Sequence, residues 1–248
     1  MKLSAILITR NEERDLPACL ESLKGLAEEI VLVDSHSDDR TREIAAAAGA
    51  RVFEKDFSGY GAQKRFALEQ ATGEWVLNVD ADERITPELA AEIRSILSGR
   101  PTENGYEIPF RLFFMGRRLR FGRGARERHL RLFRRIKGGY PERSVHEGIV
   151  VEGPVGRLKG AVDHHSYRDF SEYLRKCDEY TALLAAKKRA SGGRFTPWMH
   201  LRLPWEFFAR YFLKGGFLDG SPGFVYAALS AYYAWLKQAR LMEPIDEH

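Results

Sequence analysis

Residues 74–84 read Glu-Trp-Val-Leu-Asn-Val-Asp-Ala-Asp-Glu-Arg, an apolar run that ends in three acids. Its β-branched and aromatic side chains predict a strand that is buried on both faces. Thr86 and Pro87 then supply a helix cap and a proline at the first helical position, so a helix is expected to follow at once. Asp80 and Asp82 are therefore predicted to lie at the carboxyl end of a strand, where open α/β sheets bind their ligands.

Strand-like and helix-like segments alternate through the rest of the first hundred residues. The expected strands cover residues 3–8 and 30–33 and begin again at 52, and the expected helices cover residues 16–26, 38–48 and 62–71. This alternation predicts an α/β fold with a doubly wound, mostly parallel sheet, in which the first strand lies beside the second and the fourth. Ser37 is expected to cap the second helix.

The polar strand ends of such a sheet meet at one rim, and they favour a nucleotide site. They are Thr9, Asn11, Glu12, Asp34, Asp80 and Asp82. Asp34 can accept hydrogen bonds from a base or a ribose, and Lys64 can help to hold phosphates. The chain has neither a GxGxxG fingerprint nor a P-loop, so a metal on the paired aspartates is expected to take over that task.

Two carboxylates one residue apart suit an oxygen-preferring cation such as Mg²⁺ or Mn²⁺, which takes few protein ligands together with substrate phosphates. Two alternatives stay open for Asp80 and Asp82. One is a solvated acidic turn before a helix. The other is a phosphatase of the DxDx(T/V) kind, although Arg84 stands where that motif has Thr or Val.

Composition indicates an ordinary globular protein, with 44% hydrophobic and 30% charged residues and a net charge of +4. Cys19 and Cys177 have no metal-ligand spacing, which favours two reduced thiols in a cytosolic protein. The first residues show no signal-peptide layout, and no apolar run reaches the ~20 residues of a membrane-spanning helix.

Three ordered segments carry a resemblance to a known family. They are Ile-Leu-Ile-Thr-Arg-Asn-Glu at 6–12, Val-Leu-Val-Asp-Ser-His-Ser-Asp-Asp at 31–39, and the run from Ala71 to Asp82. Together they resemble the motifs of family 2 glycosyltransferases, which have the GT-A fold. The resemblance implies that Thr9, Glu12 and Asp34 sit at a uridine, that Asp80 faces the ribose and diphosphate, and that Asp82 holds the metal. The family often has Arg-Asn where this chain has Lys64-Arg65, and lysine lacks the planar fork of arginine.

Residues 108–121 predict a β-hairpin that turns at Met115-Gly116 and packs against the first domain. Ten arginines lie between Arg111 and Arg135 with only Glu127 opposing them, which points to an anionic partner. A phosphorylated glycolipid is preferred to nucleic acid, because no RNA-binding motif is present. Arg123, Arg131 and His146 are expected to contact this acceptor. A solvated basic face is the alternative.

Glu147 is the candidate general base, because inverting glycosyl transfer needs a carboxylate that takes the proton of the acceptor hydroxyl. The resemblance supports this role, since a subset of the family that acts on lipopolysaccharide core has a similar Val-His-Glu. Pairing of Glu147 with an arginine is the structural alternative. One of His164 and His165 is a candidate to complete the shell of the cation beside Asp82, and His165 is the one chosen; packing or substrate contact is the alternative.

The tail from residue 191 is rich in aromatic residues interleaved with cations, which is typical of helices that lie in a membrane interface. Packing against the catalytic domain or a second subunit is the alternative. The expected parts are a nucleotide-sugar-binding half (1–100), an acceptor-side region (101–190) and an aromatic, basic helical tail (191–248).

The sequence thus predicts a metal-dependent, inverting glycosyltransferase that moves a hexose, expected to be glucose, from a UDP-sugar to a lipid-linked saccharide. Resemblance suggests the inner core of lipopolysaccharide as acceptor and the inner face of the cytoplasmic membrane as location. A sugar nucleotidyltransferase is an alternative, but it needs a glycine-rich basic loop after the first strand. A non-catalytic lipid- or RNA-binding scaffold is another, and it leaves the acids without a role.

Overall fold

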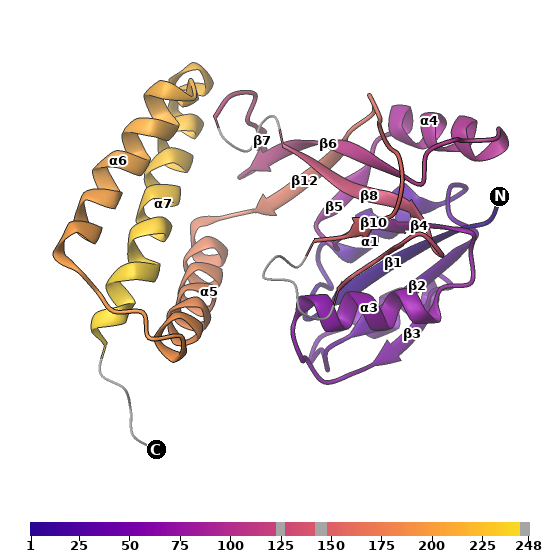
Figure 1. Cartoon of the computed structure of the whole chain (residues 1–248), viewed down its shortest axis with the longest axis horizontal. Helices are drawn as coiled ribbons and strands as arrows, with labels where there is room; N and C mark the ends of the chain where they lie inside the picture. Colours follow the sequence, from indigo (N-terminus) through magenta and orange to yellow (C-terminus); the bar gives the residue numbers. More distant parts are fainter. Residues whose placement is uncertain (123–126, 142–147, 244–248) are drawn as a thin grey trace. The chain divides into compact units, whose positions relative to one another are not determined.

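The computed structural model describes residues 1–122, 127–141 and 148–243, and it divides into two compact units (Figure 1). The sheet unit comprises Met1–Phe110 and Glu127–His164, and the helical unit comprises Arg111–Arg126 and His165–His248. This division does not follow the expected boundaries at residues 100 and 190. The reason is that the chain returns after residue 127 to add further strands to the first sheet.

Four parallel strands in the order β3-β2-β1-β4 form the first half of the sheet. They are β1 (Leu3–Thr9), β2 (Glu29–Asp34), β3 (Arg51–Glu54) and β4 (Trp75–Asn78). Ile6 of β1 pairs with Val31 on one side and with Asn78 on the other. The predicted α/β class and the predicted place of the first strand are confirmed.

The second half of the sheet is largely antiparallel, so the sheet as a whole is mixed. Beyond β4 the order is β8 (Arg128–Arg134), β6 (Gly105–Phe114), β12 (Val162–Tyr167) and β5 (Glu83–Ile85). Two further strands pair with β6, namely β7 (Arg117–Arg118) and β11 (Val155–Arg157), while β9 (Gly138–Gly139) and β10 (Val150–Val151) form a separate pair. The predicted hairpin is β6 and β7, and its turn uses positive φ angles at Met115 and Gly116.

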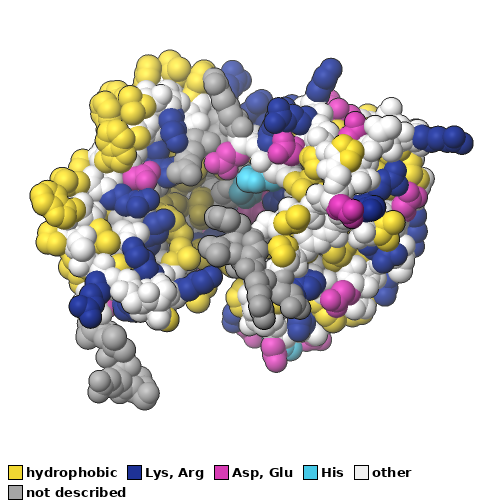
Figure 2. Space-filling view, viewed as in Figure 1, with side chains coloured by type: hydrophobic (Ala, Val, Ile, Leu, Met, Phe, Trp, Pro, Cys, Tyr) yellow, Lys and Arg dark blue, Asp and Glu magenta, His cyan; other side chains and the backbone are white. Residues whose placement is uncertain are grey.

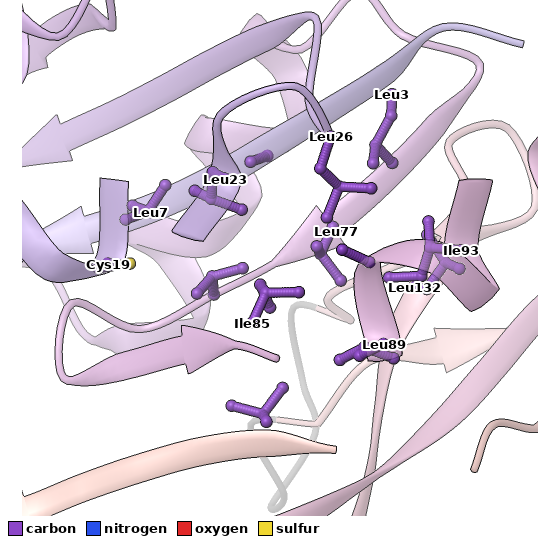
Figure 3. Packing of buried hydrophobic residues seen from close by; sticks show 14 of the residues in the cluster. Leu3, Leu7, Cys19, Leu23, Leu26, Leu77, Ile85, Leu89, Ile93 and Leu132 are labelled. Atoms are coloured by element: carbon purple, nitrogen blue, oxygen red, sulfur yellow. The ribbon is translucent and has the colours of Figure 1, made fainter. Parts of the chain in front are cut away.

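Helices cover both faces of the parallel half because the side chains of β1 alternate between two cores. Leu3 and Leu7 belong to the larger core with residues of α1 (Leu16–Leu23) and α4 (Pro87–Ser98), as Figure 3 shows. Ile6 belongs to the other core with Ala67 of α3 (Tyr60–Gln70). The sheet unit therefore excludes water from both faces of its central strands.

Helix capping agrees with the sequence-based prediction at α4 and differs from it at α2. The Thr86 hydroxyl accepts a hydrogen bond from the Leu89 amide at 3.3 Å, and Pro87 opens α4 as expected. The expected Ser37 cap is wrong, because α2 (Thr41–Ala47) begins later and the Ser37 hydroxyl donates to Asp34 instead.

The helical unit is built on α5 (Phe170–Ala190), α6 (Arg202–Phe208) and α7 (Gly220–Ala239), and α6 and α7 pack side by side (Figure 1). Shorter turns are η2 (Pro197–Leu201), η3 (Ala209–Leu213), η4 (Gly216–Asp219) and η5 (Arg240–Met242). A Cβ at Gly223 would lie 2.0 Å from the Gly216 carbonyl oxygen, so this close approach requires glycine. Among the described residues, none of the helices is long and apolar enough to cross a membrane.

Candidate active site at the end of strand β4

A tight turn joins β4 to β5 and carries Asp80, Asp82 and Glu83. The Asp80 amide donates to the Glu83 carboxylate at 2.9 Å, and the Glu83 amide donates to the Asp80 carbonyl at 3.0 Å. Upstream, the Val79 amide donates to the Ile6 carbonyl at 3.1 Å and so extends the pairing with β1. These bonds fix the turn at the carboxyl edge of the parallel strands.

Asp80 is held by two cations, one on each oxygen of its carboxylate. Lys64 Nζ lies 2.9 Å from Oδ1, and Arg131 Nη2 lies 2.9 Å from Oδ2. Burial alone would raise the pKa of Asp80, but the charges of Arg131 and Lys64 outweigh it and hold the pKa well below its usual value. Asp80 is therefore a fixed, ionised hydrogen-bond acceptor.

Arg131 links Asp80 to Glu83 from strand β8. Its guanidinium lies 2.6 Å from Glu83 Oε1 and 5.2 Å from the centre of the Phe110 ring, and its side chain is only 11% exposed. The sequence predicts that Arg131 contacts an acceptor, but the structure places its guanidinium on the buried Glu83 and the partly exposed Asp80. Burial, reinforced by the charges of Asp80 and Asp82, raises the pKa of Glu83 to about 8 against the opposing effect of Arg131.

Asp82 lies beside His164, whose Nε2 is 3.2 Å from Asp82 Oδ2. Asp82, Glu83 and His164 offer ligand atoms that all lie within 4.8 Å of one another. Two carboxylates and an imidazole are a donor set that suits Mn²⁺ and is compatible with Mg²⁺. The residues present therefore fit a divalent cation. Burial alone would lower the pKa of His164, but the hydrogen bond to Asp82 and the nearby acids raise it.

Two of the expected metal ligands, Asp80 and His165, lie outside this cluster. We chose His165, but side chains alternate along β12, and His165 stacks on Phe113 with ring centres 4.6 Å apart while its neighbour His164 faces Asp82. Asp80 is not in the cluster, and its two oxygens contact Lys64 and Arg131. Glu83 was missed as a site residue, and its only signal was that it is the third acid of the run.

Hydrogen bonds connect the loop after β1 to the loop after β2. They involve the residues that are expected to hold a nucleoside. Asp34 is fully buried and accepts from the Thr9 hydroxyl at 2.9 Å and from the Ser37 amide at 2.7 Å. Asn11, with φ of 57°, accepts from the Asp38 amide at 2.8 Å. The Glu12 amide donates to Thr41 at 2.8 Å.

These loops share an edge with the Asp80 turn. Strands β1, β2 and β4 run parallel, so the segments that follow them leave the sheet on the same side. The convergence of Asp34 and Asp82 on one edge, which the sequence predicts, is thus present in the fold. The remaining expected site residues, Arg123, His146 and Glu147, lie outside the described residues.

Comparison with known proteins bears on what this edge does. The model of the family "Glycosyl transferase family 2" matches residues 4–102. The lipopolysaccharide core biosynthesis glycosyltransferase LpsC of Rhizobium meliloti is 36% identical over 98% of this chain and 93% of its own length. An uncharacterized glycosyltransferase of Rickettsia typhi is 28% identical over 98% of this chain and 87% of its own length.

Solved structures give weaker similarity. The crystal structure of residues 1–349 of S. aureus TarS is 18% identical with a TM-score of 0.49, over 75% of this chain and 64% of that one. Glucosyl-3-phosphoglycerate synthase from Mycobacterium tuberculosis, solved with Mn²⁺, UDP and glucosyl-3-phosphoglycerate, is 25% identical with a TM-score of 0.39, over 44% of each chain. The identity to LpsC along nearly the whole chain, together with the family match, shows that this protein belongs to glycosyl transferase family 2.

Proposed function

We propose that this glycosyltransferase moves a hexose, glucose, with inversion from a UDP-sugar to a phosphorylated, lipid-linked saccharide such as the inner core of lipopolysaccharide. The observation that carries the proposal is the turn after β4, where an ion-paired carboxylate on Asp80 stands next to the donor set of Asp82, Glu83 and His164. The similarity to LpsC along the chain supports the choice of acceptor class.

Each part of the turn has a role in this reaction. Asp82, Glu83 and His164 would hold the divalent cation. When bound, Mg²⁺ or Mn²⁺ supplies positive charge that stabilises the departing diphosphate. Asp80, kept ionised by Lys64 and Arg131, accepts hydrogen bonds from the ribose.

The nucleoside side of the donor is assigned to the loops after β1 and β2. Thr9, Asn11, Glu12 and Asp34 would line the uridine, and the buried hydrogen bonds of Asp34 hold these loops in place. Such a preformed site lowers the cost of ordering the protein when the nucleotide binds.

Glu147 is proposed as the general base. Inversion requires a carboxylate that takes the proton of the acceptor hydroxyl as that oxygen attacks the anomeric carbon. Asp80 is unsuited because two cations lower its pKa, and Asp82 and Glu83 would be occupied by the cation.

The acceptor side is proposed to face a membrane. Residues 111–122 and 165–243 contain sixteen lysines and arginines against seven acids, which favours an anionic surface. Large apolar side chains of the same unit are exposed, including Trp198 and Trp205. We propose a peripheral location on the inner face of the cytoplasmic membrane, with no nucleic-acid partner.

Donor binding is tested by thermal shift with UDP, UTP and UDP-glucose, each with Mn²⁺ and with excess chelator. We expect UDP and UDP-glucose to raise the melting temperature only when Mn²⁺ is present. A preference for UTP would favour a nucleotidyltransferase, and no shift with any nucleotide would favour a scaffold.

The base is tested by glycosyl transfer with Glu147→Gln, using Glu152→Gln as a matched control on the same stretch of chain. We expect transfer by Glu147→Gln to fall by about 10²-fold or more while UDP-glucose binding persists. Turnover within a few-fold of the native protein would remove Glu147 from this role.

A further inference from the structure

The helical unit contains an open pocket of about 590 Å³ at the start of α7. Most of its lining is apolar, and the full set is Phe114, Met115, Arg117, Phe170, Asp219, Gly220, Ser221, Pro222 and Val225. The volume lies within the ~300–1,000 Å³ range of small-ligand sites, which are typically apolar with a few placed polar groups. None of these residues belongs to the turn after β4.

The two charged residues of the pocket have different surroundings. The Asp219 carboxylate accepts from the backbone amides of Arg120 and Phe121, both at 2.9 Å, so its charge is already compensated. Arg117 is exposed on β7, and within the described part of the chain no acid forms an ion pair with it. The pocket therefore offers an apolar interior and one available cation, which matches a hydrocarbon chain with an anionic head.

The surface around the pocket is also apolar. Phe217 and Leu218 of η4 and Phe224 of α7 are about half exposed, and Figure 2 shows apolar side chains gathered over this part of the helical unit. Patches of this kind mark interaction sites. The described residues of this unit, 111–122 and 165–243, carry sixteen cations against seven acids, and this excess opposes pairing with a second copy and favours an anionic surface.

We propose that this pocket takes one hydrocarbon chain of an anionic phospholipid, with the lipid phosphate at Arg117 and the surrounding aromatic side chains at headgroup depth. The inference deepens the proposed membrane location, because it names the lipid class and the pocket that binds it. It does not depend on the sugar or on the saccharide acceptor. A single bound chain is weak by itself, so basic residues nearby are needed for stable attachment.

The first experiment fills the pocket. Ser221→Trp adds an indole from an exposed lining position, and Ala190→Trp adds the same group at an exposed position on α5 outside the pocket. Flotation with vesicles of phosphatidylcholine and phosphatidylglycerol in equal parts measures binding. We expect Ser221→Trp to weaken binding about tenfold and Ala190→Trp to leave it unchanged.

The second experiment separates a specific phosphate contact from general attraction. Arg117→Glu and Arg118→Glu make the same charge change on the same short strand, but only Arg117 lines the pocket. Reversal of either charge should weaken binding to anionic vesicles about tenfold, and Arg117→Glu by at least a further fivefold. Calorimetry with dodecyl phosphate should show binding that Ser221→Trp abolishes, while inorganic phosphate should not bind.

The outcomes distinguish this inference from the proposed function. Equal vesicle binding by the native protein and Ser221→Trp, with no difference between the two arginine variants, would overturn the pocket assignment alone. If the native protein does not float with vesicles, the proposed membrane location fails with it. Self-association that Ser221→Trp abolishes would assign the pocket to a second copy and overturn the lipid. UDP binding by thermal shift confirms that each variant is folded.

Discussion

The sheet unit contains the buried ion-pair network around Arg131, whereas the helical unit carries most of the exposed large apolar side chains. In the sheet unit, Arg131 is buried against Asp80 and Glu83, and apolar residues such as Trp75 are fully covered. In the helical unit, ion pairs such as Arg175–Glu179 lie in solvent, and Trp198 is 79% exposed.

The difference indicates which kind of partner each unit binds. Burying an ion pair costs desolvation energy, but the low local dielectric makes the remaining charges act strongly on a bound diphosphate. Leaving large apolar groups in water costs free energy that only a partner or a lipid surface recovers. Four experiments test this contrast.

The largest effect is expected at Asp82. Asp82→Ala removes a carboxylate of the proposed cation site, so transfer should fall by at least about 10²-fold. Stability should change little, since its hydrogen-bond partner His164 remains partly exposed. Glu179→Ala, a surface acid on α5, is the control for kcat and for melting temperature. Full activity of Asp82→Ala in excess chelator would contradict the metal-dependent mechanism.

Arg131→Met is expected to destabilise the protein most. It leaves the buried Glu83 without its cation and Asp80 with Lys64 alone, which should cost about 3–5 kcal/mol in chemical denaturation. Arg175→Met removes an exposed pair and should cost less than about 1 kcal/mol.

If Arg131→Met and Arg175→Met have equal effects, the buried network has no special role in stability.

The next effect is a pH dependence at Glu29, where β2 begins. Burial alone would raise the pKa of Glu29, but hydrogen bonds from Ser4, Thr72 and Arg51 lower it to about 2. A lowered carboxylate pKa stabilises the fold above about pH 4.5, and the stability is lost as pH falls from there toward 2.

As pH falls from about 4.5 toward 2, the unfolding free energy of the native protein should decrease by about 2–3 kcal/mol more than that of Glu29→Gln. Glu69→Gln, at an exposed position on α3, is the control that should keep the native profile. Parallel profiles for the native protein and Glu29→Gln would contradict the assignment.

The smallest effect on stability is expected at the exposed aromatic residues. Trp198→Ser and Trp205→Ser, at positions 79% and 61% exposed, should change the unfolding free energy by no more than about 0.5 kcal/mol. Vesicle flotation should nevertheless weaken. The buried Trp75→Ala is the matched contrast and should cost about 3–5 kcal/mol. Destabilisation of several kcal/mol by Trp198→Ser would show that these side chains pack within the fold.

Much of the sheet unit could be predicted because its signals are local. The apolar runs, the Thr86 cap and the acids after β4 each act within a few residues, and parallel topology then forces the strand ends to one edge. The roles predicted for Thr9, Asp34 and Asp82 depend on that topology and on the resemblance to family 2 glycosyltransferases.

The departures from prediction at the candidate site involve partners distant in sequence, whereas the failed Ser37 cap is local. Nothing near Arg131 indicates that β8 would pair beside β4 and bring its guanidinium to Asp80, 51 residues away. The choice between His164 and His165 depends on which face of β12 meets the turn, and a shift of one residue reverses it.

The sequence by itself determined the α/β class, the order of the parallel strands and the edge at which the acids gather, because periodicity and short-range capping specify these. Its three ordered motifs carried the resemblance to the family. Tertiary structure alone decided that Asp80 is ion-paired with Lys64 and Arg131 while Asp82 lies beside Glu83 and His164. The physical reason is that the charge state and ligands of a buried carboxylate depend on which distant strands enclose it, and no local pattern records that enclosure.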